Sequence, residues 1–312
     1  MAHRELVVGS SPHIKSAITT QRIMLDVLIA LCPALIAGCV LFGPRALLLV
    51  AVCVGSCEGF EYACRRVMGR SNTLPDLSAA VTGVLLSFCL PPTLPVPMAV
   101  LGCFFAIVVV KQFFGGLGQN FANPAATARI VLMLSFTGAM TSWVEPFWYR
   151  TGADAVASAT PLVGGSYTVM ELLLGLHGGC IGETCGAALL LGGLYLALRR
   201  VINPVVPVVF VGTVAALTLA TGRELAPALL GGGLLLGAIF MATDYATTPA
   251  TTVGKAVFAL GCGVLTFLIR GYGNMPEGVS FAILLMNILA PLIDRFTATR
   301  PLGTARERGR TA

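Results

Sequence analysis

The 312-residue sequence predicts an all-α polytopic membrane protein with about ten transmembrane helices. Hydrophobic residues make up 56% of the chain and charged residues only 11%, whereas soluble domains carry about 25% charged residues. Apolar runs long enough to cross a bilayer core of about 30 Å recur along the sequence. Some runs are short and interrupted by proline or glycine, which is typical of discontinuous helices that line a cavity.

The expected spans form two halves separated by a long polar interval. An N-terminal arm covers 1–22, the first transmembrane half 23–140, an external loop 141–182, the second half 183–297 and a basic tail 298–312. Asp76 opens a short segment in the first half and Asp244 closes one in the second. With five spans in each half, the two copies would be inverted in the membrane. We expect the spans at 23–42, 46–64, 76–91, 96–114, 126–140, 183–198, 204–220, 227–243, 255–269 and 280–292.

The distribution of charge predicts the orientation in a cell membrane. If the N-terminus is cytoplasmic and the ten spans alternate, most of the 20 basic residues fall on the cytoplasmic side, as the positive-inside rule requires. Both termini are then cytoplasmic and the loop around Thr160 is external. The net charge of +6 reflects this topology and contact with anionic lipid, not nucleic acid. The basic residues that fall outside are Arg45, Arg150, Arg223 and Arg270.

The ten cysteines do not form the pattern of a secreted disulfide framework. Most lie in or beside apolar runs, where cysteine behaves as a small hydrophobic residue. We expect no metal site, because Cys53 and Cys57 lack a second pair that would complete a tetrad. Cys180 and Cys185 could pair if their side of the membrane is oxidising.

Ordered motifs along nearly the whole chain resemble those of the D subunit of the Rnf-type ion-translocating oxidoreductase complexes. The chain is more distantly similar to the B subunit of the sodium-translocating NADH:quinone reductase. The motifs are Ser11-Pro-His, Thr19-Thr, Ile23-Met-Leu-Asp26, Asp76-Leu-Ser-Ala-Ala-Val-Thr-Gly83, Gly115-Gly-Leu-Gly-Gln-Asn120, Asn123-Pro-Ala125, Ala159-Thr-Pro-Leu162, His177-Gly-Gly-Cys-Ile-Gly-Glu-Thr184, Phe240-Met-Ala-Thr-Asp244, Pro276-Glu-Gly-Val-Ser280 and Pro291-Leu-Ile-Asp294.

The resemblance implies that FMN is attached through its phosphate to Thr160 by a separate flavin transferase. The family pattern D-x-x-[ST]-G-A-T begins here at Asp154 and departs at two positions, Ala157 and Ser158. Serine cannot easily reach the backbone angles open to glycine, and Ser158 offers a competing hydroxyl. We favour Thr160, because Ala159-Thr160-Pro161-Leu162 is intact. Taken alone, the stretch is an external loop rich in Ala, Ser and Thr.

Further polar residues lie at the edges of spans. Asp76 and Asp244 are candidates for a cation pathway between half-helices, or else a helix N-cap and a loop turn. Asn120 and Asn123 could hydrogen-bond a second, non-covalent flavin such as riboflavin, or serve as turn residues.

A second group of charged residues has competing interpretations. Arg129, inside a span, needs an anionic partner, for which we expect a phosphate, Glu58 or Glu61. Charges at helix starts explain Glu171, Glu183 and Glu277, although Glu277 also belongs to a family motif and is an ion-pathway candidate. We interpret His177 as a loop histidine.

These observations favour a membrane subunit of a redox-driven cation pump that transports Na⁺ or H⁺ and works with other subunits. The chain has no P-loop, Rossmann glycine pattern or paired CxxC motifs, so nucleotide oxidation and iron–sulfur transfer would belong to those partners. A small-solute channel or transporter with inverted halves is the first alternative. A structural anchor whose flavin site has decayed is the second.

Overall fold

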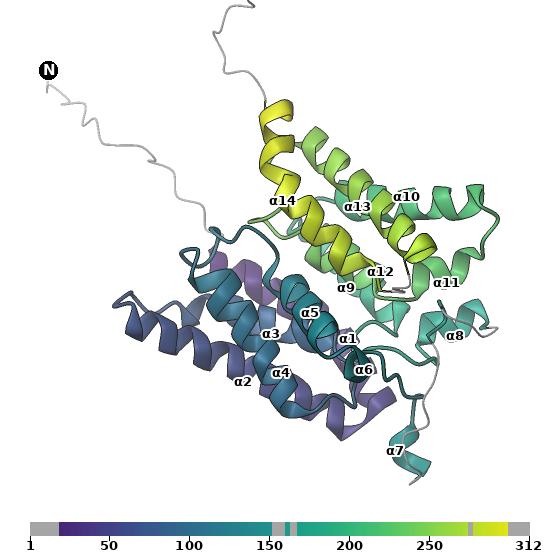
Figure 1. Ribbon diagram of the computed structural model, residues 1–312, viewed down its shortest axis with the longest axis horizontal. Coiled ribbons are helices and arrows are strands. Elements are labelled where there is room, and N and C mark those ends of the chain that lie inside the picture. Colours follow the sequence, from purple (N-terminus) through teal and green to yellow (C-terminus); the bar gives the residue numbers. More distant parts are fainter. Residues whose placement is uncertain (1–18, 152–159, 163–166, 274–276, 299–312) are drawn as a thin grey trace, which may run out of the picture.

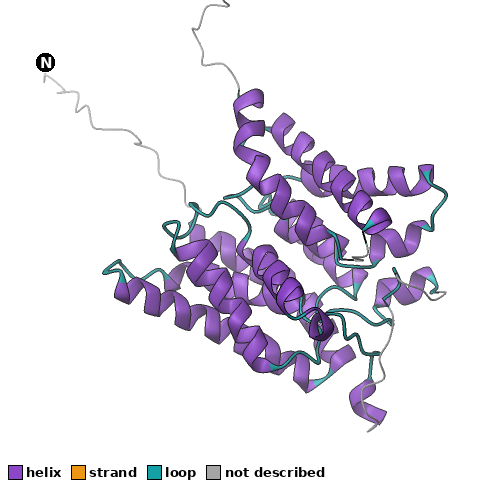
Figure 2. Ribbon diagram, viewed as in Figure 1, coloured by secondary structure: helices purple, strands orange, loops and turns teal. Residues whose placement is uncertain are grey.

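The structure is a computed structural model that describes residues 19–151, 160–162, 167–273 and 277–298. Across this part of the chain the regular structure is helical and contains no β-strand (Figure 2). Figure 1 shows two groups of helices, one coloured purple to teal and one green to yellow. The prediction of an all-α chain is therefore confirmed for the described residues.

Local sequence explains where the first helices begin. The Thr19 side chain caps the first helix by accepting the backbone N–H of Arg22. Gly43 has a φ of 76° and is followed by Pro44 at the first position of the next helix, so the chain reverses within one residue. The first group comprises α1 (Thr20–Phe42), α2 (Pro44–Val67), η1 (Leu74–Asp76), α3 (Ser78–Phe88), α4 (Val96–Phe104), its π-helical continuation η2 (Phe105–Gln112), α5 (Pro124–Ser135) and α6 (Thr137–Met140).

The second group follows two short helices, α7 (Trp148–Thr151) and α8 (Val169–Leu174). It packs against the first group through α1 with α9 and through α5 with α14. Within it, α13 packs between α10 and α14. Its elements are α9 (Gly186–Leu198), α10 (Val205–Ala220), α11 (Leu225–Leu230), α12 (Leu234–Leu236), the π-helical η3 (Gly237–Met241), α13 (Thr252–Tyr272) and α14 (Val279–Thr297).

Two helical segments, α3 and α12–η3, are shorter than a membrane span, and each has one end inside the molecule. Helix α3 has 11 residues, which corresponds to about 16 Å and is half the thickness of a bilayer core. The loop before α9 supplies hydrogen-bond donors to the carbonyls at the C-terminal end of α3. Ile181 N–H donates to the Leu90 carbonyl over 3.1 Å, and Gly182 N–H to the Phe88 carbonyl over 3.1 Å. The run α12–η3 begins beside Gly233, whose φ is 69°. The sequence prediction of broken helices is met at these two places.

Four helices, α1, α2, α13 and α14, are long and apolar enough to cross a membrane, and five shorter apolar helices accompany them among the described residues. Only 28–39% of the most apolar part of each long helix is buried, which leaves apolar side chains facing outward, as lipid requires. Ten spans and an inverted repeat remain predictions. All ten cysteines have free thiols, including Cys180 and Cys185.

Candidate functional site

Thr160 lies inside the protein, with 3% of its surface exposed. Its Oγ1 has no hydrogen-bond partner among the described residues. Pro161 and Leu162 pack against the Gly231 backbone, where a side-chain carbon added to this glycine would meet each of them at 3.6 Å. A buried hydroxyl without a partner is costly, so this atom is the first candidate for a missing ligand contact.

A cavity of about 730 Å³ adjoins this segment and is called the Thr160 cavity. Arg270 in its wall donates to the carbonyls of Ala228, Gly231 and Gly232 over 2.7, 3.2 and 2.9 Å. The Arg223 guanidinium lies 5.7 Å from the centre of the Phe267 ring. Two guanidinium groups make the cavity suited to an anionic group. Its lining comprises Pro161, Leu162, Val214, Thr218, Arg223, Glu224, Pro227, Ala228, Phe267 and Arg270.

A buried charge cluster centres on Arg129 of α5. Arg129 Nη1 lies 2.5 Å from Glu183 Oε1, and Nη2 contacts Glu277 Oε2. All three side chains are at most 4% exposed. Cys180 Sγ lies 3.8 Å from both Arg129 Nη2 and Glu277 Oε1. Burial raises the pKa of Glu277 to about 7, although the Arg129 charge opposes this shift.

The positions of Glu183 and Glu277 correct two expectations. The expectation that Glu58 or Glu61 pairs with Arg129 is wrong, since Glu183 and Glu277 occupy that role. Neither of these two serves as a simple helix-start charge. Gly233 lies against the Glu183 carboxylate, because a side-chain carbon at Gly233 would come within 2.6 Å of Glu183 Cδ. This close approach, together with the φ of 69° at residue 233, favours glycine at that position.

Two neighbouring residues behave as the sequence predicts. Glu171 forms a capping box with Thr168 at the start of α8, and this bond to Thr168 lowers the pKa of Glu171. His177 is a loop residue, as expected, and is buried with Nδ1 3.0 Å from the Gly178 carbonyl. Burial lowers its pKa, so the imidazole is neutral at pH 7.

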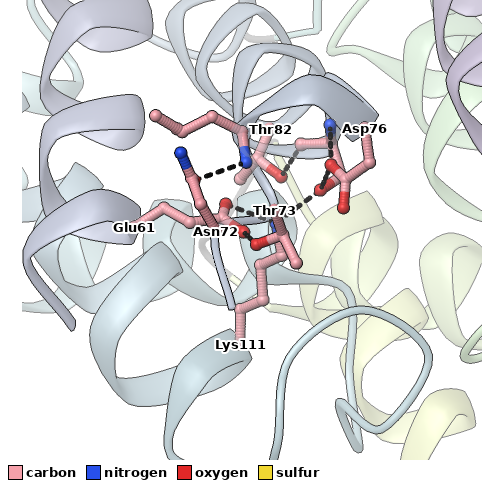
Figure 3. Close-up of polar contacts among 8 residues, drawn as sticks. Glu61, Asn72, Thr73, Asp76, Thr82 and Lys111 are labelled. Atoms are coloured by element: carbon pink, nitrogen blue, oxygen red, sulfur yellow. Dashed lines mark hydrogen bonds and ion pairs between the residues drawn. The ribbon is translucent and has the colours of Figure 1, made fainter. Parts of the chain in front are cut away.

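A second buried network connects α2, η2 and the start of α3 (Figure 3). Lys111 Nζ donates to Glu61 Oε2 over 2.7 Å and to Ser78 Oγ over 2.6 Å. Ser78 donates its hydroxyl and its backbone N–H to Asp76 over 2.5 and 2.8 Å. Thr73 Oγ1 donates to Glu61 Oε1 over 2.6 Å. Asp76 thus accepts the first backbone N–H of α3 from one residue before the N-cap, Leu77, and is also connected, through Ser78, to a buried ammonium group.

A cavity of about 780 Å³ lies beside this network and is called the asparagine cavity. Asn123 caps α5 by accepting the Ala126 N–H over 3.1 Å and donates to the Met241 carbonyl over 3.2 Å at the end of η3. Asn120 Nδ2 donates to the Ala122 carbonyl over 2.9 Å.

Apolar walls dominate the asparagine cavity, and its few polar groups converge from separate elements. Asp244 faces this space, and burial raises its pKa. The polar residues in the lining are Ser78, Thr82, Lys111, Asn120, Asn123, Thr243, Asp244 and Tyr245. The apolar ones include Ile23, Val27, Leu85 and Phe240.

Comparison with known proteins bears on this architecture. The sequence profile described as the NQR2, RnfD, RnfE family matches residues 7–303. The chain belongs to this family. It is 45% identical to the D subunit of the Na(+)-translocating ferredoxin:NAD(+) oxidoreductase complex of Acetobacterium woodii, over 98% of each chain. It is 42% identical to the D subunit of the proton-translocating ferredoxin:NAD(+) oxidoreductase complex of Clostridium ljungdahlii, over 96% of each chain. The D subunit of the ion-translocating oxidoreductase complex of Stutzerimonas stutzeri is 39% identical, over 91% of this chain and 92% of its own.

Membership of the NQR2, RnfD, RnfE family confirms the resemblance inferred from the motifs. The structure distributes the candidate residues over separate places. Asn120, Asn123 and Asp244 meet in the asparagine cavity, and Asp76 reaches it only through Ser78. Glu277 belongs to the Arg129 cluster, and Thr160 to its own segment. Ser158 lies outside the described residues.

Sequence reasoning missed Lys111 as a member of the buried polar network, together with Ser78 and the pairing role of Glu61. One signal was present: Lys111 interrupts an apolar run, and a buried lysine needs a partner. Its location in the π-helical η2 is also informative, because π-helical turns often occur at functional sites.

Proposed function

We propose that this chain is a membrane subunit of a redox-driven, ion-translocating electron transport complex. It carries FMN covalently and couples electron transfer to translocation of Na⁺ or H⁺. Support comes from relatives named as the D subunits of Na(+)- and proton-translocating ferredoxin:NAD(+) oxidoreductase complexes, which match nearly the full chain. The proposed partners are the other subunits of such a complex, membrane lipid and a flavin transferase.

The observation that carries the flavin proposal is the buried Thr160 hydroxyl beside the Thr160 cavity, which has no hydrogen-bond partner among the described residues. A phosphoester at Thr160 would have Arg223 and Arg270 in the adjoining cavity as counter-charges. FMN supplies reversible electron-transfer chemistry when bound. The chain anchors it, surrounds it with apolar walls and keeps it from diffusing away.

Removing the Thr160 hydroxyl is expected to abolish covalent flavin, because this oxygen carries the proposed phosphoester. Thr160→Ala, purified from cells that contain the flavin transferase and then denatured, should show no in-gel flavin fluorescence. It should also lack the mass increment of one FMN that we expect for the wild-type chain.

Two variants serve as controls. Ser158→Ala tests the competing hydroxyl, and Thr168→Ala removes an exposed hydroxyl from the same interval; both should keep the flavin. Signal retained in Thr160→Ala and lost in Ser158→Ala would move the attachment to Ser158. A wild-type protein without flavin would contradict the proposal and favour the channel or the structural anchor.

We also propose that the asparagine cavity holds a second, non-covalent flavin such as riboflavin. Its apolar walls and the convergent Asn120, Asn123 and Asp244 support this assignment. Asn120→Ala should lower the flavin released on denaturation about tenfold at limiting flavin, the effect of one or two lost hydrogen bonds. Released flavin is measured by chromatography, and the covalent flavin stays attached.

Asn72→Ala is the matched control, because Asn72 is exposed and lies outside the cavity. If Asn120→Ala and Asn72→Ala release the same amount of flavin, the second site does not involve the asparagine cavity.

We propose an ion pathway that uses Asp76, Asp244 and Glu277. Asp76 and Asp244 connect to the asparagine cavity, whereas Glu277 lies in the Arg129 cluster. A carboxyl with a pKa of about 7 changes protonation near neutral pH, which suits a group that exchanges a cation. We propose that the chain crosses the cell membrane with both termini in the cytoplasm and with Thr160 toward the external side.

A further inference from the structure

A third cavity, of about 710 Å³, lies where α1 begins and α9 ends, and is called the arginine cavity. Helices α1 and α9 pack against each other, which brings these two ends together at one face. The lining residues are Arg22, Ile23, Asp26, Arg199, Arg200, Val201 and Tyr245.

The charges of the arginine cavity do not balance. Asp26 is the one carboxylate in the lining, and it is already bonded. Its oxygens accept from Arg199 Nη2 over 3.3 Å each, and its Oδ1 accepts from the Tyr195 hydroxyl over 3.0 Å. Arg22 and Arg200 have no acidic partner within the residues that the structure describes. Two positive charges therefore remain for a ligand.

The backbone of Arg200 gives an independent indication. Arg200 has a φ of 55°, a left-handed conformation that non-glycine residues rarely adopt. Its N–H bonds the Ala197 carbonyl over 3.0 Å, and the Val201 N–H bonds the Leu196 carbonyl over 2.9 Å. This is a Schellman end, at which glycine is the usual residue. An arginine there strains the helix end, and such strain often marks a functional residue.

The surroundings of the arginine cavity are amphipathic. It shares Ile23, Val201 and Tyr245 with the lining of the asparagine cavity. On the outer face, Leu25 is 46% and Leu198 is 74% exposed within a turn of the arginines. A ligand here meets cations at the end of the helices and apolar side chains just beyond them.

We propose that the arginine cavity binds the phosphate of an anionic membrane phospholipid, with its acyl chains along α1 and α9. Basic pockets between helices at the cytoplasmic membrane surface are suited to such headgroups. The site uses none of the residues proposed to hold flavin by covalent or hydrogen bonds, so it can be tested independently of the flavin proposals.

The test uses the full chain in detergent, titrated with phosphatidylglycerol or phosphatidylcholine and followed by native mass spectrometry. We expect preferential binding of phosphatidylglycerol. Arg200→Gly should weaken it about fivefold, the effect of one basic group near a membrane surface, and Arg22→Gln similarly. The melting temperature of Arg200→Gly should be equal or higher, because glycine relieves the left-handed strain. Weaker binding without lower stability separates a ligand role from a structural one.

Arg66→Gln is the matched control, since Arg66 is an exposed arginine at the end of α2 outside this cavity. It should leave lipid binding unchanged. Equal affinity for the two lipids, or an equal loss in Arg66→Gln, would overturn the proposal. Competition by FMN but not by riboflavin, with no lipid preference, would assign the phosphate to a flavin and overturn the lipid assignment.

Discussion

Replacing Arg129 with methionine is expected to destabilise the protein by about 3–5 kcal/mol, because it leaves two buried glutamates without their counter-charge. Glu183 and Glu277 are each at most 4% exposed and both contact the guanidinium. Reversible unfolding in mixed SDS micelles, at a fixed pH, measures the change in the free energy of unfolding.

The loss in Arg129→Met should depend on pH. In the folded protein the pKa of Glu277 is raised from 4.5 to about 7. Stability therefore falls as the pH rises through this window, because the unfolded chain releases the Glu277 proton while the folded chain retains it. Without Arg129, whose charge opposes the shift, the penalty is larger. The destabilisation should therefore be smaller at pH 5 than at pH 8. A triple variant with Glu183→Gln and Glu277→Gln should recover most of the stability, since a neutral cluster needs no cation. Equal losses at both pH values would contradict this account.

Replacing Lys111 with methionine should also cost about 3–5 kcal/mol, because the buried Glu61 side chain would lose its counter-charge. Glu61 would keep only the 2.6 Å hydrogen bond from Thr73, and Ser78 would lose its 2.6 Å contact with the ammonium. The same unfolding measurement applies.

Lys255→Met provides the same substitution at a partly exposed lysine that forms no ion pair within the described residues. Its effect should stay within about 0.5 kcal/mol, as for most surface changes. Adding Glu61→Gln to Lys111→Met should restore part of the stability. If both lysine variants behave alike, the Glu61–Lys111 pair does not hold α2 and η2 together.

Hydropathy was most successful at predicting the long apolar helices. The expected span 23–42 corresponds to α1, and 255–269 lies within α13, because a long apolar run needs no knowledge of its neighbours. The expected span 227–243 instead contains three pieces, α11, α12 and η3. The glycines at 231–233 lie between the first two pieces and adopt backbone angles that average hydropathy does not register.

The polar interior could not be predicted in the same way. Arg129 contacts Glu183 and Glu277, and Lys111 contacts Glu61, all far apart in sequence. A basic residue in an apolar run indicates that an acidic partner exists. The sequence does not show which acidic residue is brought next to it by packing. Asn120, Asn123 and Asp244 were predicted as candidates separately. That they share one cavity follows only from how η3 packs beside the start of α5.

Helix α3 ends at Phe88 after about half the length that a bilayer core requires, and the asparagine cavity adjoins its first turns. If water or a polar ligand fills that cavity, the transmembrane voltage drops mainly across the thin dry layer of protein between the cavity and the opposite membrane surface. About 2.3 kcal/mol per unit charge and 100 mV then falls over a few residues. A charge that crosses only this dry layer would thus do most of the electrical work of a full crossing.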